Sequence, residues 1–183
     1  MCKDTLNLRK FNMMVNIVKA GADSLEVIHD MAQVVFRHTY KDILSPEQME
    51  YMMDMMYSMP NLHKQIEVGH HYYIAYRGEI PCGYVSVQYE GKDDQGVEIY
   101  HLHKIYVMPE AQGCGTGMAL FNKVIEHVRA EVKDAPARIE LNVNKYNKSV
   151  DFYKHIGLKV LVEEDFPIGN GFYKTDYIMG LDL

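Results

Sequence analysis

Residues 105–118 read Ile105-Tyr106-Val107-Met108-Pro109-Glu110-Ala111-Gln112-Gly113-Cys114-Gly115-Thr116-Gly117-Met118. An apolar strand ends at Pro109, and a glycine-rich turn then opens a long amphipathic helix. The start of a helix carries unpaired N–H groups and the positive end of the helix dipole. Glycines let the backbone approach an anion closely, so this stretch predicts a binding site for a phosphate-bearing ligand.

Two familiar phosphate-binding loops do not fit this turn. A dinucleotide fingerprint that starts at Gly113 needs glycine at position 118, where the sequence has Met118. A P-loop needs lysine directly after its last glycine, and the first lysine after this turn is Lys123. The alternative is a purely structural turn. Three alternate glycines disfavour it, because ordering them costs much backbone entropy.

Hydrophobic periodicity places the turn within a series of strands and helices. Strands are predicted at 13–19, 71–76, 81–89, 97–107, 139–143, 158–163 and 173–183. Helices are predicted from residue 24 onward, at 45–58, at 62–67, after the glycine-rich turn and at 147–156. This order of elements predicts an α/β or α+β fold around one mixed sheet.

The composition is that of an ordinary soluble domain. Its 183 residues are 48% hydrophobic and 24% charged, so we expect one domain over residues 1–183. No run is long enough for a membrane span and no export signal follows Met1, which favours a cytoplasmic protein. A formal net charge of −6 without a basic block argues against nucleic acid. Three cysteines, Cys2, Cys82 and Cys114, are too few for a disulfide framework.

Two motifs resemble those of a known family. The turn, in its residues Gln112-Gly113-Cys114-Gly115-Thr116-Gly117, resembles the Gln/Arg-x-x-Gly-x-Gly/Ala loop of the GNAT superfamily of acetyl-CoA-dependent N-acetyltransferases. The segment from Asn147 to Leu158 resembles the family's later helix, in which a Phe-Tyr pair precedes glycine. The resemblance implies a central mixed, largely antiparallel sheet of about six to seven strands flanked by helices. Residues 38–46 resemble, more faintly, bacterial polyamine N-acetyltransferases.

The resemblance also implies a function and a set of residues. Acetyl-CoA would donate its acetyl group to a primary amine by direct attack in a ternary complex, without a metal. Tyr153 would protonate the leaving thiolate, because a phenol holds its proton at neutral pH. Asn147 would contact the pantetheine arm, with a helix cap as its alternative role. The cofactor-binding residues would be Ile105, Tyr106, Val107, Gln112, Gly113, Cys114, Gly115, Thr116, Gly117, Asn147 and Tyr153.

The group that removes the amine proton is less clear from the sequence. His101 and His103 alternate on one face of the predicted strand, and imidazole titrates near neutrality. Glu98 has the opposite parity, and a chain of water molecules is a further alternative. A His-x-His pair can also ligate zinc, which leaves a metal-dependent hydrolase open if His70 or His71 supplies a third ligand. A catalytically silent acyl-CoA-binding module is the other alternative.

The acceptor site is expected on the side of the least motif-like segments, residues 39–59 and 70–76. The first third of the chain is rich in methionine, which packs adaptably in a core or at a plastic binding surface. Acidic side chains accompany tyrosines there and could hold a cation: Glu47, Glu50, Asp54 and Glu67. A polyamine is therefore the first expectation, with a peptide amine beside it. The sequence leaves the oligomeric state open, a homodimer included.

Overall fold

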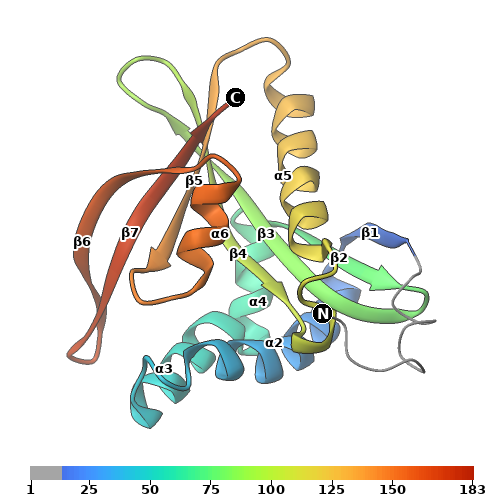
Figure 1. Ribbon diagram of the computed structural model, residues 1–183, viewed down its shortest axis with the longest axis vertical. Helices are drawn as coiled ribbons and strands as arrows, with labels where there is room; N and C mark the ends of the chain where they lie inside the picture. Colours follow the sequence, from blue (N-terminus) through green and yellow to red (C-terminus); the bar gives the residue numbers. More distant parts are fainter. Residues whose placement is uncertain (1–13) are drawn as a thin grey trace.

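The computed structural model describes residues 14–183, which form a seven-stranded mixed sheet flanked by helices (Figure 1). The strand order is β1-β2-β3-β4-β5-β7-β6. Within the described residues, β4 and β5 pair in parallel and the other neighbouring strands pair antiparallel. The predicted fold, a largely antiparallel mixed sheet of six to seven strands, is confirmed.

The bounds of the elements follow the predicted order. The strands are β1 (Val15–Ala20), β2 (His71–Arg77), β3 (Ile80–Lys92), β4 (Glu98–Val107), β5 (Ala137–Asn144), β6 (Lys159–Gly169) and β7 (Phe172–Asp182). The α-helices are α2 (Leu25–Tyr40), α3 (Pro46–Tyr57), α4 (Met59–Glu67), α5 (Thr116–Val132) and α6 (Ser149–His155). Short 3-10 turns, η1 (Ala22–Ser24) and η2 (Pro109–Ala111), precede α2 and α5.

Local signals explain several of these bounds. The Ser45 side chain accepts a hydrogen bond from the Gln48 N–H at 3.2 Å, and Pro46 occupies the first turn, so α3 starts where its sequence predicts. β3 runs through Glu90 to Lys92, although the predicted strand ended at residue 89. Pairing with β4 extends the strand there, with a register shift at Glu90. Met13, the predicted first strand residue, lies outside the described residues.

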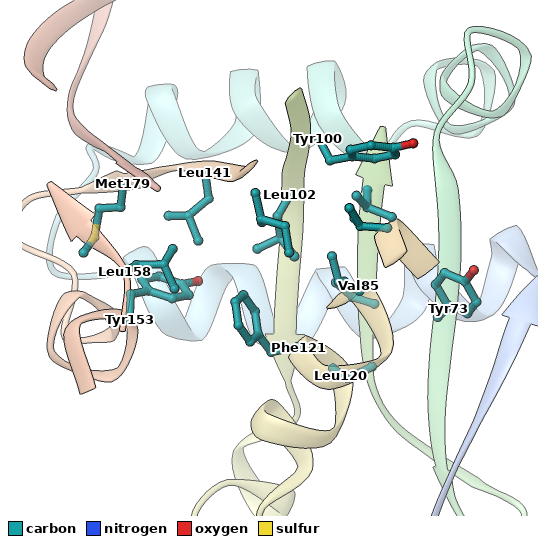
Figure 2. Close-up of a cluster of buried hydrophobic side chains, with 14 of the residues drawn as sticks. Tyr73, Val85, Tyr100, Leu102, Leu120, Phe121, Leu141, Tyr153, Leu158 and Met179 are labelled. Carbon is teal, nitrogen blue, oxygen red and sulfur yellow. The ribbon is translucent and has the colours of Figure 1, made fainter. Parts of the chain in front are cut away.

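Two hydrophobic cores lie on opposite faces of the sheet. One joins α5 and α6 to the middle strands, and Figure 2 shows Leu102, Phe121, Leu141 and Tyr153 converging there. The other joins α2, α3 and α4 to β2 and β3 through a methionine- and tyrosine-rich layer. Burial of these apolar side chains supplies the main stabilising free energy and fixes both helical layers against the sheet.

β4 and β5 separate part of the way along the sheet. Their parallel pairing covers only Glu98–His101 of β4 and Ala137–Glu140 of β5, although both strands continue. Figure 1 shows the two strands diverging toward the end of β4 that leads into the glycine-rich turn. Among residues 14–183, the edge of β4 from residue 102 to 107 that faces β5 therefore has no partner strand.

Gly83 holds β3 close to β4, and its replacement tests this packing. A Cβ atom at position 83 would lie 2.7 Å from the Tyr106 carbonyl oxygen and 3.2 Å from Leu120 Cδ1. Because the first contact is with backbone, Gly83→Ala should lower the free energy of unfolding by about 1–3 kcal/mol. Thermal unfolding followed by circular dichroism should show a melting temperature lower by about 2–4 °C per kcal/mol.

Gly117→Ala is the matched control. A Cβ atom there comes no closer than 3.7 Å to a neighbour, and alanine is the better helix former on α5. Its melting temperature should equal or exceed that of the wild type. Equal melting temperatures for Gly83→Ala and the wild type would contradict the close approach of the two strands.

Candidate active site

A cavity of about 750 Å³ occupies the space where β4 and β5 diverge, and we call it the inter-strand cavity. Its walls come from β4 (Ile105, Tyr106 and Val107), β5, α2, α6 and the glycine-rich turn. The backbone N–H and C=O groups of the open β4 edge need partners, and an extended chain with amide groups could supply them. The cavity thus joins an unpaired strand edge to the start of α5.

The glycine-rich turn has the backbone that its sequence predicts. Gly113 and Gly115 adopt φ values of +72° and +79°, which side-chain-bearing residues rarely adopt. Gly115 is the N-cap of α5 and provides no side-chain cap, so the first N–H groups of the helix stay available to a ligand. Gln112 donates a hydrogen bond from Nε2 to the Val107 carbonyl at 3.0 Å and ties the turn to β4.

Two predicted cofactor-binding residues contribute mainly to the interior of the turn. The Thr116 side chain is 1% exposed and donates to the Ala111 carbonyl, so its hydroxyl is turned away from the cavity. Arg77 of β2 donates from Nη2 to the Cys114 carbonyl at 2.8 Å and to Thr116 Oγ1 at 3.2 Å. Neither Cys114 nor Thr116 lines the inter-strand cavity. Cys114 and Thr116 instead stabilise the turn, whose residues Gly113, Gly115 and Gly117 line the cavity.

The Asn147 side chain forms the hydrogen bond of a helix start, one of the two roles that the sequence left open. Its Oδ1 accepts a hydrogen bond from the Ser149 N–H at 2.9 Å, as a residue at a helix start does. Its Nδ2 donates to the Tyr40 hydroxyl of α2 at 3.4 Å, and Asn147 lines the inter-strand cavity. Capping therefore uses the oxygen and leaves the amide N–H₂ group on the cavity side.

Tyr153 projects from α6 into the same cavity. Its side chain is 7% exposed, and Figure 2 shows the hydroxyl directed away from Leu158 toward β4. No hydrogen bond joins that hydroxyl to another residue in the range 14–183. Burial, and to a smaller extent the neighbouring Tyr40, raise the pKa of the phenol above its usual value. The phenol is thus a protonated donor at neutral pH.

A second cavity, of about 400 Å³, adjoins the first, and we call it the adjoining cavity. Four residues line both cavities: Tyr40, His103, Tyr106 and Asn142. Its other walls come from α2, α3, α4 and β7, including the methionines Met52, Met55 and Met56. A small molecule here could meet a ligand of the inter-strand cavity at the shared residues.

The paired histidines of β4 lie at this junction. The pairing of β3 with β4 shifts register next to His103, which marks a β-bulge in β4. The His101 and His103 ring centroids lie 4.6 Å apart, and the His70 ring lies 4.3 Å from that of His103. All three line the adjoining cavity, while only His103 reaches both. The two predicted candidate bases are thus brought together beside a third imidazole.

His103 and His101 have different neighbours, which fix the protonation of the His103 ring and place a carboxylate beside His101. Burial, followed by the nearby His101 and His70, lowers the pKa of His103 to about 2, so its ring is neutral. The Nε2 atom of His103 lies 2.9 Å from Gln88 Oε1, an acceptor, so Nε2 carries the ring proton. His101 Nδ1 instead lies 3.6 Å from a carboxylate oxygen of Glu90. The His101 imidazole lowers the pKa of the Glu90 carboxyl group.

Several predicted groups lie elsewhere. Glu98 pairs with Lys92 at 2.9 Å at the far end of β4, where the strand still pairs with β5, and it lines neither cavity. The predicted cation-binding carboxylates are exposed and also outside the adjoining cavity: Glu47, Glu50, Asp54 and Glu67. Helix geometry turns them to solvent because the buried faces of α3 and α4 are apolar.

The charged residues of the adjoining cavity were missed by sequence reasoning. They are Lys104 of β4 and the pair Lys174 and Asp176 of β7. One sequence feature could have pointed to Lys104: it is a charged residue in a strand otherwise rich in apolar and aromatic side chains. Tyr40 lines both cavities, but no sequence signal pointed to it, because it fits the apolar pattern of α2.

Neither a metal site nor a membrane-spanning helix is found in the described part of the chain. Within residues 14–183, no three His, Cys, Asp or Glu side chains converge as ligands of a metal would. The hydrolase alternative therefore lacks a ligand set there. Over the same residues, no helix is both long and apolar enough to cross a membrane.

Comparison with known proteins identifies the family. The model of the acetyltransferase (GNAT) domain matches residues 38–179. An uncharacterized N-acetyltransferase of Methanocaldococcus jannaschii is 38% identical over 63 residues, which are 34% of this chain and 26% of that protein. The chain thus matches about a quarter of the length of that curated relative.

Solved structures show the same fold. A PaiA N-acetyltransferase from Thermoplasma acidophilum, in complex with coenzyme A, superposes with a TM-score of 0.74 at 21% identity, covering 93% of this chain and all of that one. The ribosomal-protein-S18-alanine N-acetyltransferase from Escherichia coli superposes with a TM-score of 0.66 at 16% identity, covering 92% and 94% of the two chains. Together with the family match, these findings assign the chain: it belongs to the GNAT acetyltransferase family.

Proposed function

We propose that the protein transfers the acetyl group of acetyl-CoA to the nitrogen of a primary amine, by direct attack in a ternary complex. The observation that carries the proposal is the inter-strand cavity, which joins an unpaired β4 edge, the glycine-rich turn and the Tyr153 hydroxyl. Relatives of the same fold have coenzyme A bound or are N-acetyltransferases by name. No metal is required by this chemistry, because backbone N–H groups supply the positive field for the diphosphate.

The residues present suit coenzyme A. The N–H groups from Gly113 to Gly117 would hold the diphosphate, where no Cβ atom obstructs its approach at Gly113 or Gly115. The open edge from Ile105 to Val107 would pair with the amides of the pantetheine arm as an added strand does. Asn147 would donate to the arm from the opposite wall.

The chemical step needs a base and an acid on opposite sides of the thioester. The amine nitrogen forms a bond with the acetyl carbon, the carbon–sulfur bond breaks, and the thiolate leaves. Tyr153 would donate its phenolic proton to that sulfur. The proton lost by the amine would pass to His101, whose imidazolium Glu90 can stabilise across 3.6 Å. The neutral His103 ring, at the junction of the cavities, would accept a hydrogen bond from the amine and orient it.

Two substitutions at one position test the diphosphate site. Gly115→Asp and Gly115→Asn add side chains of equal size at a φ of +79°, a conformation that both residues tolerate. Only aspartate adds a negative charge beside the diphosphate. We therefore expect Gly115→Asp to bind acetyl-CoA about tenfold more weakly than Gly115→Asn, a difference of about 1.4 kcal/mol.

Isothermal titration calorimetry of both variants measures this difference, with thermal melting as the control for folding. Equal affinities of the two folded variants would place the diphosphate elsewhere. Activity with amines is not needed for this test, so it separates cofactor binding from catalysis.

A further inference from the structure

Lys104 places an amino group in the wall of the adjoining cavity. The residue is 4% exposed, and its Nζ donates a hydrogen bond to Gln65 Oε1 of α4. The same Nζ lies 5.6 Å from the centre of the Tyr57 ring and 5.5 Å from that of the Tyr72 ring. Among residues 14–183, no Asp or Glu side chain forms an ion pair with it.

These contacts satisfy the ammonium only in part. A lysine ammonium has three donors, and the structure gives Lys104 one acceptor, Gln65 Oε1, which also accepts from the Tyr72 hydroxyl. Burying a charge without a counterion is costly, and burial lowers the pKa of Lys104 to about 7. An anion brought into the cavity would supply the missing partner.

The other charges of the cavity leave this cation uncompensated. Asp176 is buried, and Lys174 Nζ lies 3.0 Å from its Oδ2 without forming a hydrogen bond to it, so the ion pair offsets these two charges in part. Burial lowers the pKa of His70 to about 4, and His103 is likewise neutral. Glu90 lies outside the cavity lining and faces the β4 histidines. Apart from the His101 imidazole, which Glu90 faces, a protonated Lys104 gives the wall one cationic group more than it has anionic groups.

We infer that the amine acceptor also carries a carboxylate, and that the Lys104 ammonium binds this carboxylate in the adjoining cavity. The inference rests on the proposed acetyl transfer and names its substrate class: a small amino acid or a closely related amino carboxylate. A cavity of about 400 Å³ suits a molecule of that size. Phe36, Leu44 and the three methionines of the wall would contact its apolar part.

The inference replaces the polyamine that the sequence suggested. A polyamine is cationic along its whole length, and the exposed carboxylates that were expected to bind it lie outside the cavity. With Lys174 paired to Asp176, the protonated Lys104 would repel its distal ammonium groups. An amino carboxylate instead offers its carboxylate to Lys104 and its amino group to the β4 histidines.

The test combines a substitution of Lys104 with removal of the carboxylate charge from the acceptor. Acetyl transfer is measured for amino acids with apolar side chains and for their C-terminal amides, with wild type and Lys104→Met. We expect kcat/KM of the wild type to favour the acid, and this acid-to-amide ratio to fall at least about tenfold in Lys104→Met. Comparing ratios cancels the different amine pKa values of acid and amide.

Lys64→Met, an exposed change on α4, is the matched control and should keep the wild-type ratio. Thermal melting should show both variants folded, since methionine fills the lysine stem's volume without a charge. An equal loss for acids and amides would overturn the inference and indicate a packing or proton-transfer role for Lys104. Faster acetylation of polyamines than of any amino acid would also overturn it, while the acetyltransferase proposal would stand. Absence of transfer to every amine would overturn the proposed function and this inference together.

Discussion

Tyr153→Phe should lower kcat about a hundredfold or more, while the Kd for acetyl-CoA stays within about twofold of the wild type. The substitution keeps the ring that packs beside Leu158 and removes only the hydroxyl that faces the cavity. The proton donor acts on the sulfur as its charge develops, so its loss is felt in the transition state and not in the bound ground state. Steady-state kinetics and calorimetric titration of acetyl-CoA measure the two quantities.

Tyr146→Phe is the control for this change, because Tyr146 is 71% exposed and lines neither cavity. It should retain wild-type kinetics. A Tyr153→Phe enzyme with wild-type kcat across the pH range would show that the thiolate departs without this donor. A loss confined to acetyl-CoA affinity would instead make Tyr153 a binding residue.

His101→Ala should lower kcat/KM for the amine about a hundredfold at pH 7, with the loss shrinking as the pH rises. An alkyl amine has a pKa near ~10 and arrives at pH 7 as an ammonium, which needs a base. Toward pH 10 more of the amine arrives neutral, so the missing base matters less. Profiles of kcat/KM from pH 6 to 10 for wild type and variant measure this convergence.

Two further variants sharpen the assignment of the base. Glu90→Gln keeps the His101 imidazole but removes its carboxylate partner, so we expect a smaller loss with the same pH dependence. His63→Ala changes an exposed histidine of α4 and should behave as the wild type. A His101→Ala loss that stays constant across the pH range would assign the proton to another group.

The sequence predicted the fold because its strongest signals are local. The glycine-rich turn needs positive φ values at Gly113 and Gly115, and the alternating apolar residues of β4 and β5 mark two buried strands. Both signals depend on backbone conformation and burial within a few residues of chain. The same holds for the cap at Ser45, which fixes the start of α3.

The adjoining cavity could not be predicted in this way, because its lining is assembled from residues across the sheet. A β-bulge at His103 changes which side chains share a face of β4, and strict alternation does not reveal it. Lys104 comes to lie against Gln65, 39 positions earlier, and Asp176 arrives from β7. The composition of α3 and α4 suggested a cation site, yet their carboxylates face solvent.

The activity that we propose for this chain is the transfer of an acetyl group from acetyl-CoA to an amine. The most direct measurement is release of the coenzyme A thiol from acetyl-CoA, with and without amines, combined with mass spectrometry of the product. Amino acids, polyamines, amino sugars and peptide N-termini make up the amine panel. We expect amine-dependent release of one thiol for each N-acetylated product formed. Tight binding of acetyl-CoA without release in the presence of any amine would contradict this proposal and indicate a catalytically silent acyl-CoA-binding module.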